Sequence, residues 1–304
     1  MRVTLGMLTG RAQINIEAAS ERLLEAQDRA SSGKRIRRPS DDVPGTGRAM
    51  SLRSSIASIE QFERNSDVAN SQLSVTSGAL DTVVSALRDA RNLALKAVNS
   101  PLTDDARAAI DTQLGEIMEQ MAGAANTQYA GKYIFAGGLS DTKPIVPGAG
   151  GSAPYVYQGN SGQFTIQTSP GTYMTANVTG DQVFNMGGVA VSGVPDAFST
   201  IKSLKDKILA GDAAGVSDTI STIDANLNNV ITIRSQVGAR LNRLEASRAA
   251  LDSSKTTAQG LLSKTEDADL AEAAIELQTR QNVYQAALST ASRIMQTTLA
   301  DFFN

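Results

Sequence analysis

Cysteine and histidine do not occur among the 304 residues of the chain. The lack of cysteine excludes thiol nucleophiles and disulfide bonds, and the lack of histidine excludes Ser-His-Asp triads and nearly all zinc sites. Catalysis by carboxylate, lysine or tyrosine side chains remains open. The composition therefore disfavours an enzyme, and we expect no catalytic, cofactor-binding or metal-binding residues.

Aromatic residues are also scarce, at 4% of the chain, and tryptophan is absent, although 41% of the residues are hydrophobic. A core of alanine, leucine, isoleucine and valine suits thin helical bundles, in which small side chains let helices approach closely. The net charge of -3 gives no support to a nucleic-acid partner or an anionic membrane surface, because both require a strong basic excess.

Long apolar runs are missing as well. No stretch approaches the roughly 18 apolar residues of a transmembrane helix, so we expect no membrane insertion. The first ten residues contain no apolar run of the length found in signal peptides. If the protein is exported, we expect export without a cleaved signal peptide.

The pattern that is present is heptad spacing, with apolar residues at alternating intervals of three and four. A helix of about 50 residues is about 75 Å long at 1.5 Å per residue. The sequence therefore predicts a mainly α fold of long antiparallel helical rods with paired terminal helices. The spacing predicts helices over residues 5–30, 49–98, 110–124, 198–208, 216–262 and 270–302.

Residues 137–195 have a different character, since glycine, proline, serine and threonine become frequent. Short alternating runs separated by turn residues predict strands there. The helical pattern on either side is nearly palindromic, so the simplest packing pairs the two chain ends and the two rods, with a small β-rich insert domain at the far tip. We predict terminal helices in 1–43 with 266–304, a rod domain in 44–136 with 196–265, and the insert in 137–195.

The terminal helices have little apolar surface to bury within one chain. The N-terminal pattern is largely alanine, and at about 25 cal/mol per Å² such a pair gains little against the entropy of ordering it. We predict that both ends are poorly ordered in the free monomer and fold when neighbouring subunits cover them, in an interface that forms a helical array. The residues expected at this interface are Leu5, Ile16, Ala19, Leu23, Leu270, Ala274, Leu277, Tyr284, Leu288, Met295, Phe302 and Phe303.

Several motifs resemble segments of the bacterial flagellin superfamily. The segments similar to flagellins in general are Ser31–Ile36, Pro39–Asp42, Gln236–Asn242 and Glu266–Asp269. The segments similar to the hook-filament junction proteins of that superfamily are Tyr133–Gly137, Tyr157–Gly162 and Asp181–Phe184. The first of these three, Tyr133–Gly137, is the most discriminating.

The resemblance implies a flagellin-like fold. It also implies a structural adaptor of the bacterial flagellum, located outside the cell at the hook-filament junction and exported by the flagellar type III apparatus. The implied partners are neighbouring copies, another hook-associated protein on the hook side, flagellin on the filament side and a cytoplasmic export chaperone. In the family, the chaperone and lattice contacts involve the C-terminal helix, which corresponds to Leu270–Phe303 here. The alternatives are a short flagellin that forms the filament itself and a helical enzyme with a carboxylate site in the insert.

Some local motifs have both a plain and a functional interpretation. Asp41 with Asp42, and the acids of Glu266–Asp269, are more typical of turns and helix N-caps than of acid-base or metal chemistry. We interpret Gly148–Ala153 as a plain loop and Asn177–Thr179 as a chance match to a glycosylation site. The basic run Lys34–Arg38 is either a solvated loop or a contact for an acidic patch on a neighbour.

Overall fold

The computed structural model describes residues 5–99, 103–148, 153–186 and 195–302, and their side chains apart from those of residues 5, 6, 8, 9 and 294–302. The described residues are mainly helical, which confirms the mainly α fold, and α2 and α6 are rods of 57 and 54 residues. Within these ranges, none of the helices is both long enough and apolar enough to cross a membrane. The helices are α1 (Leu5–Ser32), α2 (Val43–Asn99), α3 (Asp104–Ala125), α4 (Gly180–Phe184), α5 (Ala197–Ala210), α6 (Ala213–Glu266) and α7 (Leu270–Phe302).

The helix boundaries follow local capping chemistry. Thr103 caps α3, because its side chain accepts a hydrogen bond from the backbone N–H of Ala106. Asp196 caps α5 in the same way through Ser199. Gly211 ends α5 with a φ of 69°, in the left-handed region that glycine adopts without a steric penalty.

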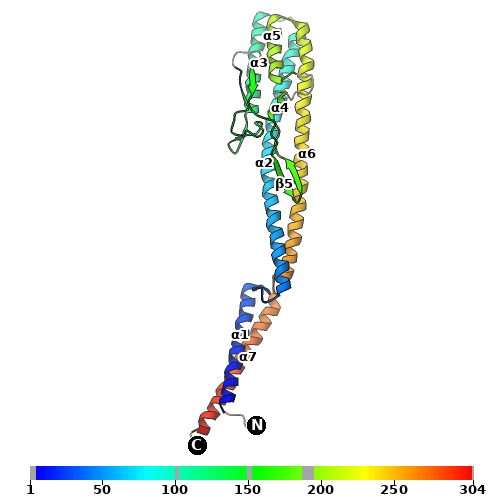
Figure 1. The fold of residues 1–304 in the computed structure, drawn as a ribbon. Helices are drawn as coiled ribbons and strands as arrows, with labels where there is room; N and C mark the ends of the chain where they lie inside the picture. The colour runs from blue at the N-terminus through cyan, green and yellow to red at the C-terminus, as the bar shows by residue number, and fades with distance from the viewer. Residues whose placement is uncertain (1–4, 100–102, 149–152, 187–194, 303–304) are drawn as a thin grey trace. The chain divides into compact units, whose positions relative to one another are not determined.

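The chain divides into two compact units, residues 1–58 with 254–304, and residues 59–253. In the first unit α1 packs along α7, which confirms the predicted pairing of the terminal helices (Figure 1). The sequence placed domain limits where the helical pattern breaks, near 43 and 266, whereas the first unit also includes the adjoining ends of α2 and α6. The three-domain division stays a prediction.

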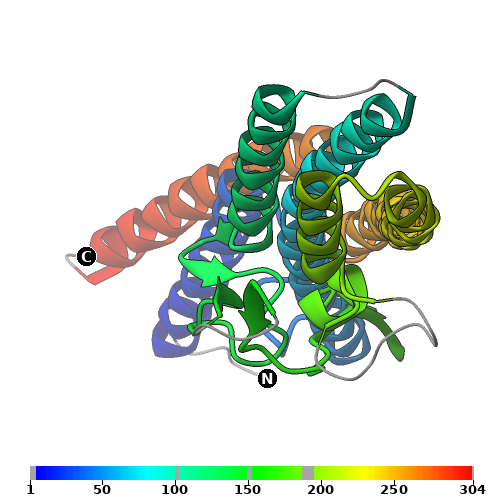
Figure 2. The same cartoon turned by 90° about the horizontal axis from the view of Figure 1, so that it is seen from above.

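The second unit has its own hydrophobic core. Figure 2, seen from above, shows α2, α3, α5 and α6 grouped together, with the strands on one side of the group. Phe184 lies within 6.2 Å of Phe135 and 5.4 Å of Phe198, ring centroid to ring centroid, so the insert is anchored to the same core. The buried core residues of the helices include Leu73, Leu80, Leu87 and Ala94 of α2, Ile110, Leu114 and Met121 of α3, Phe198, Ile201 and Leu204 of α5, and Val216, Ile223, Val230, Val237 and Leu244 of α6.

The strands form separate antiparallel pairs, each of two strands in the described residues. They are β1 (Gln128–Tyr129) with β2 (Lys132–Tyr133), β3 (Ile145–Pro147) with β4 (Tyr155–Tyr157), and β5 (Thr165–Ser169) with β6 (Thr172–Thr175). A two-stranded hairpin is marginal in water, so each needs support from the helices.

The predicted position of the insert at the tip of the rod is wrong. The β5–β6 hairpin lies along the flank of α2 and α6 (Figure 1). Asn65 of α2 donates to the carbonyl of Gln167 at 2.9 Å, and Arg240 of α6 donates to the carbonyl of Asn177 at 3.0 Å. These side chains satisfy backbone carbonyls that a hairpin beyond the helix ends would leave to solvent.

Candidate assembly interface

The α1–α7 pair of the first unit is held by small residues. Ala19 and Ala26 of α1 and Ala273 and Ala291 of α7 are buried, at 2 to 8% exposure. Small side chains let the two backbones approach closely. We call the following eight buried or half-buried residues of this pair the inner seam: Ile16, Ala19, Leu23 and Ala26 of α1, and Ala273, Leu277, Tyr284 and Ala291 of α7.

Large apolar side chains remain exposed on the same two helices. Ile275 is 70% exposed, Leu270 is 64% exposed and Ile14 is 65% exposed. A two-helix pair covers one side of each helix, so the rest faces solvent in a single copy. Exposed apolar groups gathered on one element mark an interaction surface. We call this set the outer apolar surface: Ile14, Leu24, Leu270, Ile275, Val283 and Leu288.

The predicted interface residues divide between these two sets. Leu270 and Leu288 belong to the outer apolar surface, and Ala274 is also exposed. The side chains of Leu5, Met295 and Phe302, and residue Phe303 as a whole, lie outside the described residues. The predicted residues that lie in the inner seam, within one chain, are Ile16, Ala19, Leu23, Leu277 and Tyr284.

The sequence reasoning did not select Ile14, Leu24, Ile275 or Val283. Each lies outside the apolar stripe of three-and-four spacing, and that stripe predicts only the residues within it. The available signal was their occurrence as large apolar residues at positions where an amphipathic helix carries polar ones.

A buried carboxylate ties together the loops that connect the helices of the first unit. Glu266 is 4% exposed, and Lys34 Nζ and Arg53 Nη2 both donate to its Oε1 at 2.5 Å. The bond from Lys34, reinforced by Arg53, lowers the pKa of Glu266 below its usual value of 4.5, although burial opposes the shift. The predicted turn or cap role of Glu266 is therefore wrong. Glu266, Lys34 and Arg53 are called the Glu266 cluster below.

Backbone hydrogen bonds support the Glu266 cluster. The N–H of Arg35 donates to the carbonyl of Glu266 at 2.7 Å, and the N–H of Ala268 donates to the carbonyl of Gly33 at 2.8 Å. Gly33 has a φ of 66°, which lets the chain turn out of α1 directly into this pairing. The two connecting loops are thus bonded to each other at the end of the α1–α7 pair.

Asp42 and Asp269 cap helices, and Asp41 forms hydrogen bonds within a turn, as predicted. Asp42 Oδ1 accepts from the N–H of Gly45 at the start of α2, and this bond is the main cause of the lowered pKa of Asp42. Asp41 accepts from the N–H groups of Arg38 and Arg37, which lower its pKa in the same way. Asp269 accepts from the N–H of Ala271 at the start of α7. Among the described residues, no group of three or more acids lies together as a metal site would need.

The basic run Lys34–Arg38 finds acidic partners within its own chain. Besides Lys34 with Glu266, Arg35 pairs with Asp42 at 3.2 Å and Arg37 pairs with Asp28 at 2.6 Å. These pairs account for much of the charge of the loop without an acidic patch on a neighbour.

Two motif segments of the insert lie against each other. The hydroxyl of Tyr157 donates to the carbonyl of Phe135 at 2.9 Å, and burial together with nearby Asp181 raises the pKa of Tyr157 to about 12. A Cβ on Gly137 would lie only 2.0 Å from the carbonyl oxygen of Asn160. Tyr133–Gly137 and Tyr157–Gly162 are therefore parts of one packed turn, and glycine is required where they cross.

The insert gives little support to a carboxylate enzyme site. Residues 137–195 contain two acids, Asp141 and Asp181. Asp141 is exposed, whereas Asp181 is buried and accepts from Ser161 Oγ at 2.7 Å and from the N–H of Gln182 at 2.9 Å. Asn177 is also buried, with its amide bonded to the backbone of Phe164 and Gly162, so its side chain is not presented for glycosylation.

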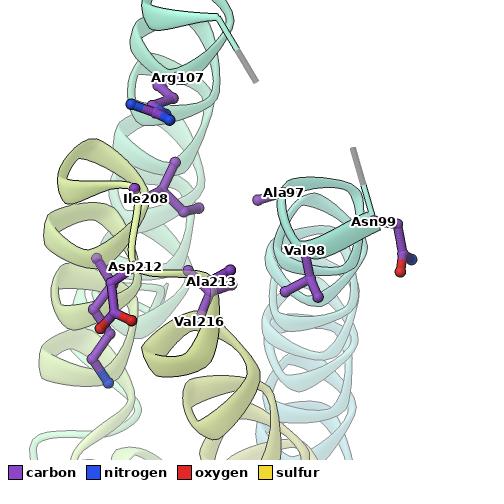
Figure 3. Close-up of a pocket in the computed structure, with 10 residues that line it drawn as sticks. Ala97, Val98, Asn99, Arg107, Ile208, Asp212, Ala213 and Val216 are labelled. Carbon is purple, nitrogen blue, oxygen red and sulfur yellow. The ribbon is translucent and has the colours of Figure 1, made fainter. Parts of the chain in front are cut away.

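A hollow of about 260 Å³ lies at the end of the second unit, where α5 turns into α6. Figure 3 shows Val98 of α2 and Ala213 and Val216 of α6 around it. Its polar groups serve local structure: Asp212 accepts from the N–H of Gly215, and Lys207 donates to Thr219. The hollow is a gap between helix ends, and its described lining residues form no arrangement of nucleophile and base.

Comparison with known proteins agrees with this architecture. The family model for the bacterial flagellin N-terminal helical region matches residues 5–139, and the model for the C-terminal helical region matches residues 220–303. Flagellar hook-associated protein 3 of Salmonella typhimurium is 27% identical over 264 residues, which cover 80% of this chain and 81% of that protein. The flagellin of Listeria monocytogenes is 22% identical over 297 residues, which cover 98% of this chain and 96% of the flagellin.

The fold is shared with a solved structure. Hook-associated protein 3 from Legionella pneumophila matches with a TM-score of 0.62 and 20% identity, over 70% of this chain and 97% of that one. The two family models together span well over half of the sequence, including the terminal helices α1 and α7 and most of α2 and α6. The chain therefore belongs to the bacterial flagellin superfamily, within which it is similar over most of its length to flagellar hook-associated protein 3.

Proposed function

We propose that this chain is the structural adaptor that joins the hook of the bacterial flagellum to its filament. The observation that carries the proposal is the outer apolar surface of the α1–α7 pair, which a single copy leaves uncovered. The similarity to hook-associated protein 3 supports the junction as the place where the surface is covered. The relatives are flagellar structural components, which agrees with a role other than catalysis.

The partners follow from this role. Neighbouring copies would cover the outer apolar surface laterally, another hook-associated protein would meet the chain on the hook side, and flagellin would meet it on the filament side. Leu270–Phe303 would bind the export chaperone before assembly, because the same exposed apolar residues need cover in the cytoplasm. The protein would then act outside the cell, as part of the flagellum.

The assembly interface is proposed to use the outer apolar surface directly and the inner seam indirectly. Leu270, Ala274 and Leu288 are exposed and available to a neighbour. Ile16, Leu23 and Leu277 would instead hold α1 against α7, so that the outer surface has a fixed shape.

Ile275→Glu tests this division. Ile275 is 70% exposed, so the substitution should leave the helical content of the monomer unchanged and abolish assembly, because a buried carboxylate without a partner strongly disfavours an interface. Gln278→Glu, at an exposed position on the same helix, is the matched control and should still assemble. Normal flagella from the Ile275→Glu chain would exclude this surface as the interface.

A second candidate is a short flagellin that polymerises into the filament, since flagellin of Listeria monocytogenes aligns with nearly the whole chain. Labelled electron microscopy of intact flagella separates the two functions. An adaptor lies in one narrow band between hook and filament, and its loss leaves hooks that release flagellin. Label along the whole filament would overturn the adaptor and favour the flagellin.

A further inference from the structure

The rods α2 and α6 each bury a regularly repeating set of side chains. Buried residues of α2 recur every seven positions, and those of α6 do the same over a longer stretch. If one helix slides along another by seven residues, a strict heptad repeat again presents the same apolar face to its partner. The repeat therefore specifies which face of each helix is buried, but it specifies the axial register between the two helices less well. The repeating residues are Leu73, Leu80, Leu87 and Ala94 of α2, and Val216, Ile223, Val230, Val237, Leu244 and Leu251 of α6.

Ion pairs of one common register join the same two helices in the second unit. Asp67 pairs with Arg248 at 2.8 Å, Asp81 with Arg234 at 2.5 Å, and Arg91 with Asp224 at 2.6 Å. From the first pair to the second, α2 advances fourteen residues and α6 goes back fourteen. From the second to the third, both change by ten, so all three pairs belong to one antiparallel alignment.

We propose that these three ion pairs, the register pairs, select the axial register of α2 against α6. The order of charges is asymmetric, with two acids and then a base along α2. If α6 slid along α2 by three residues in one direction or by four in the other, Asp67 would face Glu245 or Asp252. Either residue would repel Asp67, because both are acidic. A slip of a full heptad would place Asp81 opposite Leu227 or Leu241, which leaves Arg234 without its acid.

The register pairs act on specificity more than on stability. Their side chains are 37 to 59% exposed, and ion pairs at such exposure contribute little to the free energy of folding. Their effect lies in the difference between the aligned and slipped states. Asp81 and Arg91 lose their oppositely charged partners in each of the four slips, and Asp67 does so in three of them, since one heptad slip places it opposite Lys255. The inference goes beyond the proposed function and does not depend on it.

Spin-label distance measurement tests the proposal, because the chain has no cysteine and two introduced ones are unique. Ser85→Cys on α2 and Ser221→Cys on α6 are exposed and axially staggered, so a heptad slip changes their stagger by about 10 Å at 1.5 Å per residue. In this background, D67N/D81N/R91Q removes one partner of each pair without introducing repulsion. The matched control R64Q/R88Q/D89N neutralises three exposed charges of α2 outside the register pairs.

The control chain R64Q/R88Q/D89N should show the same single spin-label distance as the chain with only the two introduced cysteines. The D67N/D81N/R91Q chain should keep its helical content but show a broadened or second spin-label distance. A folded D67N/D81N/R91Q chain with the parental distance would overturn the proposal and assign the register to other contacts, such as those of Asn65 and Arg240 with the insert. The swapped chain D67R/D81R/R91D/D224R/R234D/R248D keeps every pair attractive and must fold with the parental distance. If D67N/D81N/R91Q unfolds, a swapped chain that also fails to fold overturns the proposal.

Discussion

Glu266 is buried, whereas the acids that follow it in the same turn, Asp267 and Asp269, are exposed. Glu266→Gln keeps the shape of the side chain and removes the charge that Lys34 and Arg53 surround. We expect the free energy of unfolding to fall by about 1–2 kcal/mol, because charge-assisted bonds to half-exposed cations become weaker neutral ones. Thermal unfolding followed by circular dichroism measures the change, and Glu272→Gln, at an exposed acid in the first turn of α7, serves as the control.

The same residue predicts a pH dependence. Since the pKa of folded Glu266 lies below its usual value of 4.5, its stabilisation is complete above pH 4.5 and is lost as the pH falls through the lower, folded pKa. The unsubstituted chain should therefore lose more stability than Glu266→Gln between about pH 5 and pH 3. Asp41 and Asp42 also have lowered pKa values and contribute equally to both chains. Unfolding curves that shift in parallel for both chains would contradict this assignment.

Residue roles were predictable from the sequence where the partners are local. Asp42 and Asp269 act on N–H groups two or three positions away, so the cap pattern alone identifies them. Glu266 lies in an equally acidic turn, yet its partner Lys34 is more than two hundred positions away. No local pattern carries that information, and only the pairing of the two connecting loops creates the cluster.

At the scale of elements, the α1–α7 pair depends on small residues in its inner seam. Ala26 is 2% exposed, so Ala26→Leu forces a larger side chain between two close backbones and should destabilise the pair by about 1–3 kcal/mol. Hydrogen exchange of the α1 and α7 amides should then become faster while amides of α3 and α5, in the other unit, are unaffected. Ala271→Leu, at an exposed position of α7, should change neither. Unchanged exchange in α1 of the Ala26→Leu chain would refute the close-packed seam.

The existence and length of the helices were predictable because the heptad spacing is sustained over many turns. The spacing did not predict which face of a helix meets another helix of the same chain and which face meets a neighbouring subunit. Ile16 and Ile14 are two positions apart on α1, one in the inner seam and the other 65% exposed, and both are isoleucines. Spacing identifies an apolar stripe, but it does not identify what covers the stripe.

At the scale of the whole molecule, the mainly α architecture and the pairing of the terminal helices followed from the palindromic order of helical segments. The position of the insert did not. A segment in the middle of the sequence is expected at the far end of an antiparallel rod, but α3 and α5 lead the chain back along the rod on either side of the insert. The β5–β6 hairpin and the segment after it then meet α2 and α6 at Asn65 and Arg240, whose side chains donate to the carbonyls of Gln167 and Asn177.

Removal of residues 270–304 tests whether assembly depends on the first unit while the second unit folds independently. Without α7, the alanine-rich seam of α1 has no partner, and an isolated helix of 28 residues with so little apolar surface gains too little to stay folded. The second unit keeps its own core and the register pairs, so its helical signal and its cooperative unfolding should remain. We expect the truncated chain to form no hook-filament junction in cells, with flagellin released to the medium, and to resist limited proteolysis within 59–253 while α1 is cut rapidly. Normal flagella from the truncated chain would contradict the role of the α1–α7 pair, and loss of the protected 59–253 fragment would contradict the independence of the second unit.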